Sequence, residues 1–494
     1  MNISNRFSAN LIAVLGSGLA PFAITLITLP LLIEIIGLER YGLLSIAWMV
    51  TSSVGFLQMG MGRAVVQRLN AARRVGSIGS LDDRNSILIS AFSLTLAASV
   101  AASVIASIAI YTYCVSFEVV ASDLMLEVLK GLVFLSASVF LGFWVSLLLG
   151  VYQADERFYF YSTIRFFNVA GAQLLPLAAA FAFKPEFDIL MMAVMTSRMA
   201  IVIAMLYGIR SDLRQMTKSK LTRARSLDLL SFGGWVSVLG LLSPMLVILD
   251  RFLIGAAFGA GAVGIYTVAY NLCTRLLVIP TSVSNVMLPK LSRLTGELLN
   301  LHSSRGLQVT AMLMTPTVVG FVVVYEPFVT VWMNFEIAAQ TSRIAAILAI
   351  GVWITSIAQG PYTRLTSENR VRTIAIWHMM QVPVYAVALW LSLKALGPIG
   401  AAYCWSARTV ADTIGLMIIS RMRLVWTDLL LFGLVVMTTC SQILIPEASQ
   451  RLIVGTVLIA SSLVTASAKF ISLGGMQILR KRSSKVQESK ADLE

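Results

Sequence analysis

The chain has 494 residues, of which 57% are hydrophobic and only 13% are charged, which excludes an ordinary soluble protein with about 25% charged residues. Its net charge of +14 does not indicate nucleic-acid binding, because the cations lie in short segments between apolar runs and not in a basic patch interleaved with aromatic residues. The composition therefore predicts a polytopic membrane protein of the all-α class.

No catalytic, metal-binding or cofactor-binding constellation is expected. The four cysteines show no C-x-x-C spacing, and His302 and His378 are the only histidines, so neither a structural metal nor a disulfide framework is predicted. Gly259, Gly261 and Gly264 match the dinucleotide fingerprint G-x-G-x-x-G. An apolar helical run precedes them in place of a strand, so they are interpreted as a tight external turn.

Apolar runs long enough to cross a bilayer, about 20 residues each, recur along the chain. The first lacks a signal-peptide cleavage site and is expected to remain as a span. Fourteen spans are predicted, at 10–36, 41–62, 86–114, 124–150, 159–182, 189–209, 228–255, 262–288, 307–333, 338–360, 373–393, 398–420, 427–445 and 451–473. Kinks are expected in runs that contain Pro30, Pro280 or clustered glycines.

Lysine and arginine are concentrated in alternate loops, which places both termini in the cytoplasm and agrees with an even number of spans. No external loop is long enough to form a folded domain. The predicted organisation is an N-terminal six-helix lobe at 1–209, a basic cytoplasmic linker at 210–227, a C-terminal six-helix lobe at 228–423, two additional transmembrane helices at 424–475 and a charged cytoplasmic tail at 476–494.

Two weak sequence echoes relate the lobes. At one common offset the pairs are Gly37 with Gly259, Gly42 with Gly264, Ala47 with Ala269 and Trp48 with Tyr270, and at a slightly shorter offset Gly150-x-Tyr152 pairs with Gly360-x-Tyr362. Both halves begin on the cytoplasmic side. The echoes therefore predict a parallel repeat, the arrangement of alternating-access transporters with a central site between halves.

A group of motifs lies at the ends of the first, seventh and eighth predicted spans and between the two halves. They are Gly37-x-x-x-Tyr41-Gly42, Asp250-Arg251, Gly259 to Gly264 with Ile265-Tyr266, and the basic segment between halves. On these motifs the sequence resembles the Wzx-type flippases of O-antigen and other surface polysaccharides, in the MOP/MATE-like superfamily.

The resemblance implies two six-helix lobes in a V around a central cavity. It implies movement of an undecaprenyl-diphosphate-linked oligosaccharide from the inner to the outer leaflet of the bacterial cytoplasmic membrane. It also implies membrane lipids, and polysaccharide polymerase and export proteins, as partners. The first span lacks the arginines that the lipid II flippase carries there, so lipid II is not the expected cargo.

Charged residues inside the apolar runs are the candidate site, because a charge at the bilayer centre costs about 2.5–3.5 kcal/mol and usually faces a bundle interior. Arg275 shares a polar stripe with Asn271 and Ser282, which indicates either cavity lining or a hydrogen-bonding seam between helices. The predicted substrate-binding residues are Arg275, Asn271, Arg198, Arg408 and Arg251, and the predicted coupling or gating residues are Asp250, Glu34 and Asp412.

Structural alternatives stay open for several of these residues. Arg408 and Asp412 are four apart and can pair with each other, while Arg198 either reaches a polar interior or pairs with another helix. Asp250 and Arg251 point to different faces, one to the cavity and the other to headgroups.

Glu34 is either a gate or a cation ligand, or it is a solvated helix end. A short polar face of His378, Gln381 and Tyr385 either carries a proton or has only a packing role.

Two other functions compete with the flippase. A cation-coupled drug exporter of the MATE type would need carboxylates in the cavity, whereas the charge within the spans is mostly arginine. A membrane polymerase or ligase of the same pathway would need a large external loop with catalytic residues, which the sequence lacks.

Overall fold

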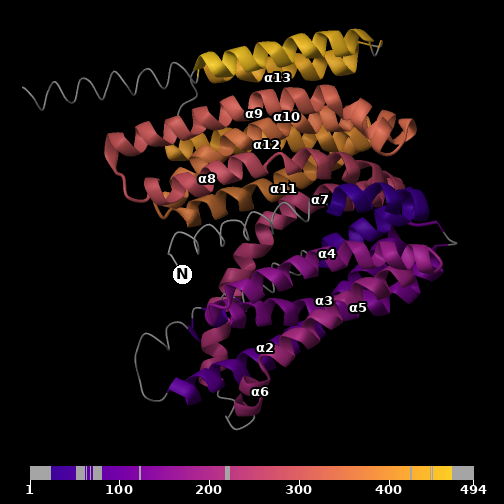
Figure 1. The fold of residues 1–494 in the computed structure, drawn as a ribbon, viewed down its shortest axis with the longest axis vertical. Coiled ribbons are helices and arrows are strands. Elements are labelled where there is room, and N and C mark those ends of the chain that lie inside the picture. The colour runs from indigo at the N-terminus through magenta and orange to yellow at the C-terminus, as the bar shows by residue number, and fades with distance from the viewer. Residues whose placement is uncertain are drawn as a thin grey trace, which may run out of the picture. The chain divides into compact units, whose positions relative to one another are not determined.

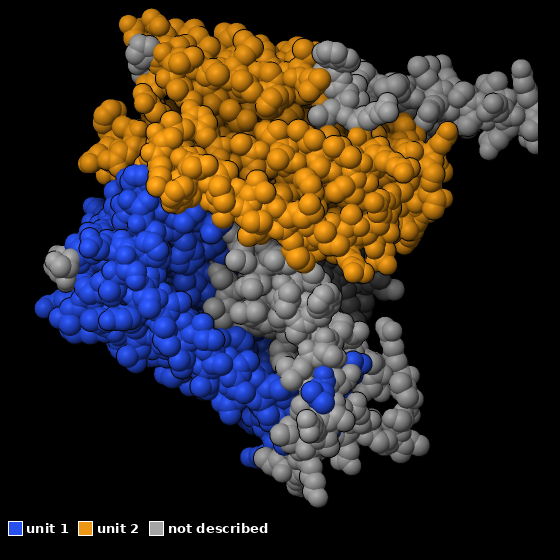
Figure 2. All heavy atoms as spheres, turned by 180° about the vertical axis from the view of Figure 1, so that it is seen from behind, with its two compact units in different colours: residues 1–267 blue, residues 268–494 orange. Residues whose placement is uncertain are grey.

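The computed structural model describes residues 24–51, 62, 64–66, 68–69, 80–121, 124–216, 223–422, 426–445, 447 and 449–469. Throughout these residues the regular structure is helical and no strand occurs. The chain divides into two compact units, Met1–Thr267 and Val268–Glu494, which Figure 2 shows in separate colours.

Unit 1 is a bundle of long apolar helices. Its elements are a helix over residues 24–51, α2 (Ser80–Ser116), α3 (Met125–Ala154), α4 (Phe158–Ala182), α5 (Phe187–Gly208), the short α6 (Arg210–Met216) and most of α7 (Arg223–Arg275) (Figure 1). α3 packs against both α2 and α5, and α4 packs against α5. Leu148, Tyr152 and Met205 are fully buried where these helices meet. Close van der Waals packing of this kind drives the association of helices in a bilayer.

Unit 2 is organised around one central helix. Its elements after α7 are α8 (Val278–Leu291), α9 (Gly296–Trp332), α10 (Phe335–Ser367), α11 (Val371–Leu396), α12 (Pro398–Ser420), α13 (Trp426–Leu444) and a helix at Ser449–Lys469 (Figure 1). In the most apolar segment of α10, 78% of the residues are buried, compared with 22% in the corresponding segment of α11. α10 therefore forms the core, on which α8, α9, α12 and α13 pack.

Nine helices in the described part of the chain are long and apolar enough to cross a membrane, so the polytopic all-α class is confirmed. From 86–114 to 189–209, and again from 307–333 onward, each predicted span coincides with one helix. Residues 10–23, and most of 52–79, lie outside the described residues, as does the predicted tail at 476–494.

The first echo of the sequence is present in the backbone. Gly37 has a φ of 77° and Gly259 a φ of 79°, the left-handed region that glycine enters at no steric cost. At Gly259 two helical segments of α7 meet at a kink. The predicted turn at 259–264 is thus confined to a single residue, and its counterpart at Gly37 bends in the same way.

These kinks are packed against each other reciprocally within unit 1. A Cβ built on Gly42 would overlap the carbonyl oxygen of Ala260, and a Cβ on Gly264 would lie 2.7 Å from the carbonyl oxygen of Leu38. Leu38 and Ala260 are themselves related by the same offset as the two glycines. Gly42 and Gly264 therefore allow the backbones to approach across a local pseudo-twofold contact.

The predicted span at 262–288 is not continuous. α7 ends at Arg275 and α8 begins at Val278. The N–H groups of Leu276 and Leu277 bond three residues back, to Cys273 and Thr274, at 3.2 and 3.1 Å. Pro280 explains the position of this break, because its ring clashes with the carbonyl four residues earlier, at Leu276. The expected kink is therefore present as an interruption upstream of the proline.

Ion pairs at the helix ends join residues assigned to the same side of the membrane. In unit 1, Arg40 lies in the predicted external loop after the first span, and it makes two hydrogen bonds, at 2.6 and 3.0 Å, to Glu127 near the external end of the predicted span 124–150. In unit 2, Arg451 donates to Glu326 at 2.5 Å, again between predicted external residues. These pairs support the predicted alternation of loops.

A counterpart on the predicted cytoplasmic side lies in unit 1. Arg84 donates to Asp155 at 2.8 Å and to Asp212 at 2.7 Å, which fastens α2 to the end of α3 and to α6. α6 lies inside the predicted linker at 210–227. Along the chain, the boundary between the two compact units falls between Thr267 and Val268, well after that linker. The division of the spans into six, six and two stays a prediction.

Candidate functional site

Asp250 and Arg251 lie inside unit 1, shortly before the kink at Gly259, with 0% and 5% of their surfaces exposed. The Tyr266 hydroxyl donates to Asp250 Oδ2 at 2.7 Å, and the Arg251 backbone N–H donates to Asp250 Oδ1 at 2.8 Å. The kink at Gly259 bends α7, and Tyr266, which follows it, lies against Asp250. The prediction that one of the two charged residues meets external headgroups is wrong, because both are buried.

The Arg251 guanidinium extends toward the helix over residues 24–51, where its Nη1 lies 3.5 Å from Met49 Sδ. A buried carboxylate that accepts two hydrogen bonds is satisfied and fixed in orientation. Asp250 and Arg251 therefore place opposite charges beside the reciprocal glycine contact. Glu34, which precedes the first kink, is exposed.

The polar cluster of unit 2 joins α11 to α12. Asp412 Oδ1 accepts hydrogen bonds from Trp377 Nε1 at 3.0 Å and from Gln381 Nε2 at 2.7 Å. His378 Nε2 lies 3.3 Å from the same oxygen. The sequence identified His378 and Gln381 as one polar face and Asp412 separately, and the structure brings them together with Trp377, which the sequence analysis did not identify.

Arg408 forms no ion pair with Asp412, so the alternative in which these two residues pair within α12 is not the arrangement observed. Its guanidinium carbon lies 5.3 Å from the ring centroid of Tyr385, a cation–π contact with about 0.5–2 kcal/mol of stabilisation. Asp412 is turned toward α11 because three polar groups of that helix converge on it. The cluster thus holds a carboxylate, an imidazole and a guanidinium in one helix pair.

Span 262–288 carries the predicted substrate stripe, and the break at 276–277 interrupts it. Arg275 is exposed at the last residue of α7, and Asn271 is half-buried one turn earlier. Ser282 is exposed on α8, where its hydroxyl bonds to the carbonyl of Val278 at 2.7 Å. The two halves of the stripe therefore belong to different helices.

Arg198 pairs with another helix, one of the two predicted alternatives. Its Nη1 donates to the carbonyl oxygen of Ser138 at 2.7 Å, which connects α5 to α3 in unit 1. A guanidinium that fixes a neighbouring backbone has a packing role, and a role in substrate binding stays a prediction.

Sequence reasoning missed the ion pair that closes the last helical hairpin. Lys469 donates to Asp428, and the two residues are 9% and 1% exposed. Asp428 lies at the start of α13, and Lys469 is the last residue of the helix Ser449–Lys469 that follows it. In an antiparallel hairpin those positions share one membrane depth, and this was the available signal. In the described ranges, no group of three or more His, Cys, Asp or Glu residues could hold a metal ion.

Comparisons with known proteins agree with this architecture. A protein of Shigella flexneri that is named as an O-antigen transporter is 21% identical over 401 residues, which is 80% of this chain and 93% of that protein.

Two solved structures share the fold. The lipid II flippase MurJ in an inward closed conformation has a TM-score of 0.72 at 15% identity, with 93% of this chain and 98% of that chain covered. An inward-facing MATE multidrug transporter of the MOP superfamily has a TM-score of 0.65 at 16% identity, with 83% and 96% covered. At these identities the likeness shows a fold that flippases and drug exporters share.

The family model described as polysaccharide biosynthesis protein matches residues 31–336, more than half of the chain. This match confirms the family resemblance found in the sequence motifs. The chain is a polytopic membrane protein with the fold of the MOP-superfamily transporters, and it belongs to the polysaccharide biosynthesis protein family.

Proposed function

We propose that this chain is a flippase that moves an undecaprenyl-diphosphate-linked oligosaccharide from the inner to the outer leaflet of the bacterial cytoplasmic membrane. The observation that carries the proposal is the family match over residues 31–336. The relative named as an O-antigen transporter, matched over 93% of its length, gives further support. The relatives with functional names are transporters or flippases, and the chain is a transporter, not a polymerase or ligase.

Cations within the membrane-spanning helices suit this cargo. A diphosphate must cross a medium that rejects anions, and arginine supplies permanently charged donors with planar, bidentate geometry. Arg275 is exposed at the end of α7, and we assign it the principal contact with the diphosphate. Asn271, Arg251 and Arg408 are assigned to the same task.

Alternating access is the proposed mechanism. Asp250, Glu34 and Asp412 are assigned to coupling or gating, and the reciprocal packing of Gly42 and Gly264 supports a parallel repeat. Both termini are assigned to the cytoplasm, as the positive-inside rule predicts. Unlike a MATE-type exporter of cationic drugs, this chain would select an anionic headgroup.

The test is lipid analysis of a strain in which the gene is deleted. The proposal predicts that an undecaprenyl-diphosphate-linked oligosaccharide accumulates on the cytoplasmic face and that surface polysaccharide is lost, with recovery on re-expression. Normal surface polysaccharide in the deletion strain, together with increased sensitivity to cationic drugs, would favour the drug exporter.

A further inference from the structure

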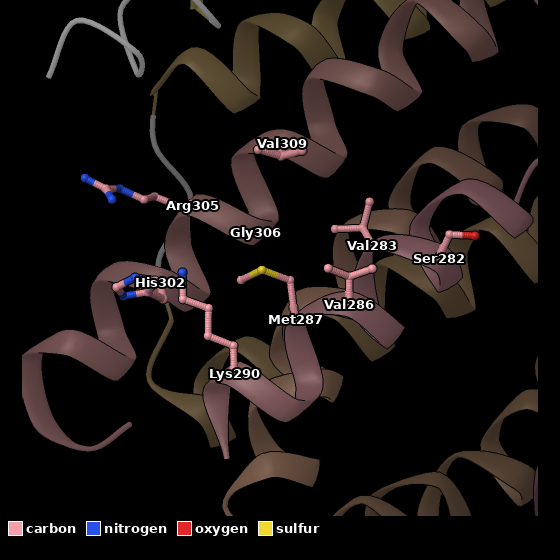
Figure 3. Close-up of a pocket in the computed structure, with 9 residues that line it drawn as sticks. All are labelled: Ser282, Val283, Val286, Met287, Lys290, His302, Arg305, Gly306 and Val309. Carbon is pink, nitrogen blue, oxygen red and sulfur yellow. The ribbon is translucent and has the colours of Figure 1, made fainter. Parts of the chain in front are cut away.

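A groove of about 500 Å³ lies between α8 and the first part of α9 in unit 2 (Figure 3), within the usual size of about 300–1,000 Å³ for ligand sites. We call it the α8–α9 groove. It is open because Gly306 carries no side chain, since a Cβ there would approach Met287 Cε to 3.0 Å. The function proposed above makes no use of this groove.

One end of the α8–α9 groove is basic. Lys290 at the end of α8, and His302 and Arg305 near the start of α9, line it together (Figure 3). The Nδ1 atom of His302 lies 2.9 Å from the carbonyl oxygen of Leu298, to which it donates, and Nε2 donates to an anion when the ring is in its protonated form. Lys290, His302 and Arg305 thus lie at the end of the groove where the two helices are joined, with the Arg305 guanidinium directed outward (Figure 3).

These cations lack the partners that other basic residues of the chain have. In the described ranges, Arg40, Arg84 and Arg451 each form an ion pair with a carboxylate. Neither Lys290 nor Arg305 has an ion-pair partner among the described residues. The basic end of the groove is therefore complementary to an anion that the described residues do not supply.

The rest of the groove is apolar. Val283, Val286, Met287 and Val309 line it (Figure 3), and Val286 is 77% exposed, as expected of a side chain that faces lipid chains. The one uncharged polar side chain of the lining is Ser282, whose hydroxyl is bonded to its own helix. The groove thus offers no amide or carboxylate to bind sugar hydroxyls.

We propose that the α8–α9 groove binds an anionic phospholipid, with its phosphate on Lys290, His302 and Arg305 and one acyl chain along the apolar wall. Basic pockets between membrane-spanning helices bind anionic headgroups in this way. A zwitterionic headgroup places a cation beside the same arginine and lysine, and so it binds more weakly. The absence of amide and carboxylate side chains from the described lining favours a phospholipid over the lipid-linked oligosaccharide.

The test uses the purified, delipidated full chain and native mass spectrometry with phosphatidylglycerol or phosphatidylcholine of identical acyl chains. The double variant Lys290→Gln/Arg305→Gln should bind phosphatidylglycerol about tenfold more weakly, the loss expected for one or two charge-assisted contacts. Arg293→Gln is the matched control, because Arg293 is an exposed cation between the same two helices and does not line the groove.

A second variant tests the apolar wall independently. Val286→Trp places an indole in the groove at an exposed position, and it should reduce binding of phosphatidylglycerol without lowering the yield of monodisperse protein. Equal affinity of the wild-type chain for both phospholipids would overturn the proposal, as would an equal loss in Arg293→Gln. Displacement of phosphatidylglycerol by an equimolar polyprenyl phosphate would assign the groove to the cargo lipid instead.

Discussion

The reciprocal glycine contact makes a quantitative prediction for Gly42→Ala. The new methyl group would overlap the Ala260 carbonyl oxygen, a backbone atom that cannot rotate away. Inserting a methyl group into a packed site costs about 1–3 kcal/mol, and the intrinsic gain of alanine over glycine in a helix is about 1 kcal/mol. Because the obstructing atom belongs to the backbone, the upper half of the cost applies, and a net loss of about 1–2 kcal/mol is expected.

The repeat predicts the same result on its other side. In Gly264→Ala the methyl group would lie 2.7 Å from the Leu38 oxygen, whereas ordinary contacts begin at 3.4 Å, so the backbones must separate by about 0.7 Å. Gly261→Ala is the matched control, because no heavy atom lies within 4 Å of the position that its Cβ would take. That variant should be neutral or gain up to about 1 kcal/mol.

The assay is the temperature at which half of the purified chain is lost from the monodisperse peak after heating in detergent. Gly42→Ala and Gly264→Ala should both lower this temperature, and Gly261→Ala should leave it unchanged or raise it. A wild-type temperature for Gly42→Ala would refute the packing argument. A drop for Gly42→Ala alone would refute the reciprocity.

Substitutions at three further positions, Arg275, Asp412 and Lys469, probe the charged residues. Arg275→Ala should stop polysaccharide export at normal membrane abundance, and Arg275→Lys should retain part of it because charge remains without the planar fork; normal export by Arg275→Ala would remove its assigned role. Asp412→Ala leaves the N–H donors of Trp377 and Gln381 without their acceptor. It should therefore destabilise the chain by about 1–3 kcal/mol, measured by the heating assay described above. A stable but inactive Asp412→Ala protein would indicate that Asp412 acts in coupling and not in stability. Lys469→Ala isolates a buried carboxylate and should cost about 3–5 kcal/mol, with much of the stability recovered in Lys469→Ala/Asp428→Ala; an equally unstable double variant would contradict the pairing.

Much of the fold could be predicted because it depends on local properties of the sequence. Runs of about 20 apolar residues locate helices without knowledge of their neighbours. Gly37 and Gly259 were visible as an echo because a left-handed turn restricts the residue type at both positions. The interruption at 276–277 was predicted only as a kink, since proline shows that a helix is disturbed but not how far upstream the ladder opens.

The candidate site was less accessible from the sequence, because its members are chosen by tertiary packing. Asp412 has a cation four residues away on its own helix, which favours a local pair, yet Trp377, His378 and Gln381 of α11 converge on it instead. Periodicity identifies a polar face but not the helix that covers it. The partner of Arg198 is a backbone carbonyl, which no pattern of side chains could reveal.

The central claim is that this chain moves a lipid-linked oligosaccharide between leaflets. Its most direct measurement uses proteoliposomes that contain the purified chain and an undecaprenyl-diphosphate-linked oligosaccharide, with a membrane-impermeant sugar-modifying enzyme added outside. The proposed function predicts that the inner-leaflet pool becomes accessible to the enzyme over time with the wild-type chain and stays protected with Arg275→Ala. An accessible fraction that stays at the level of protein-free liposomes for the wild-type chain would contradict it.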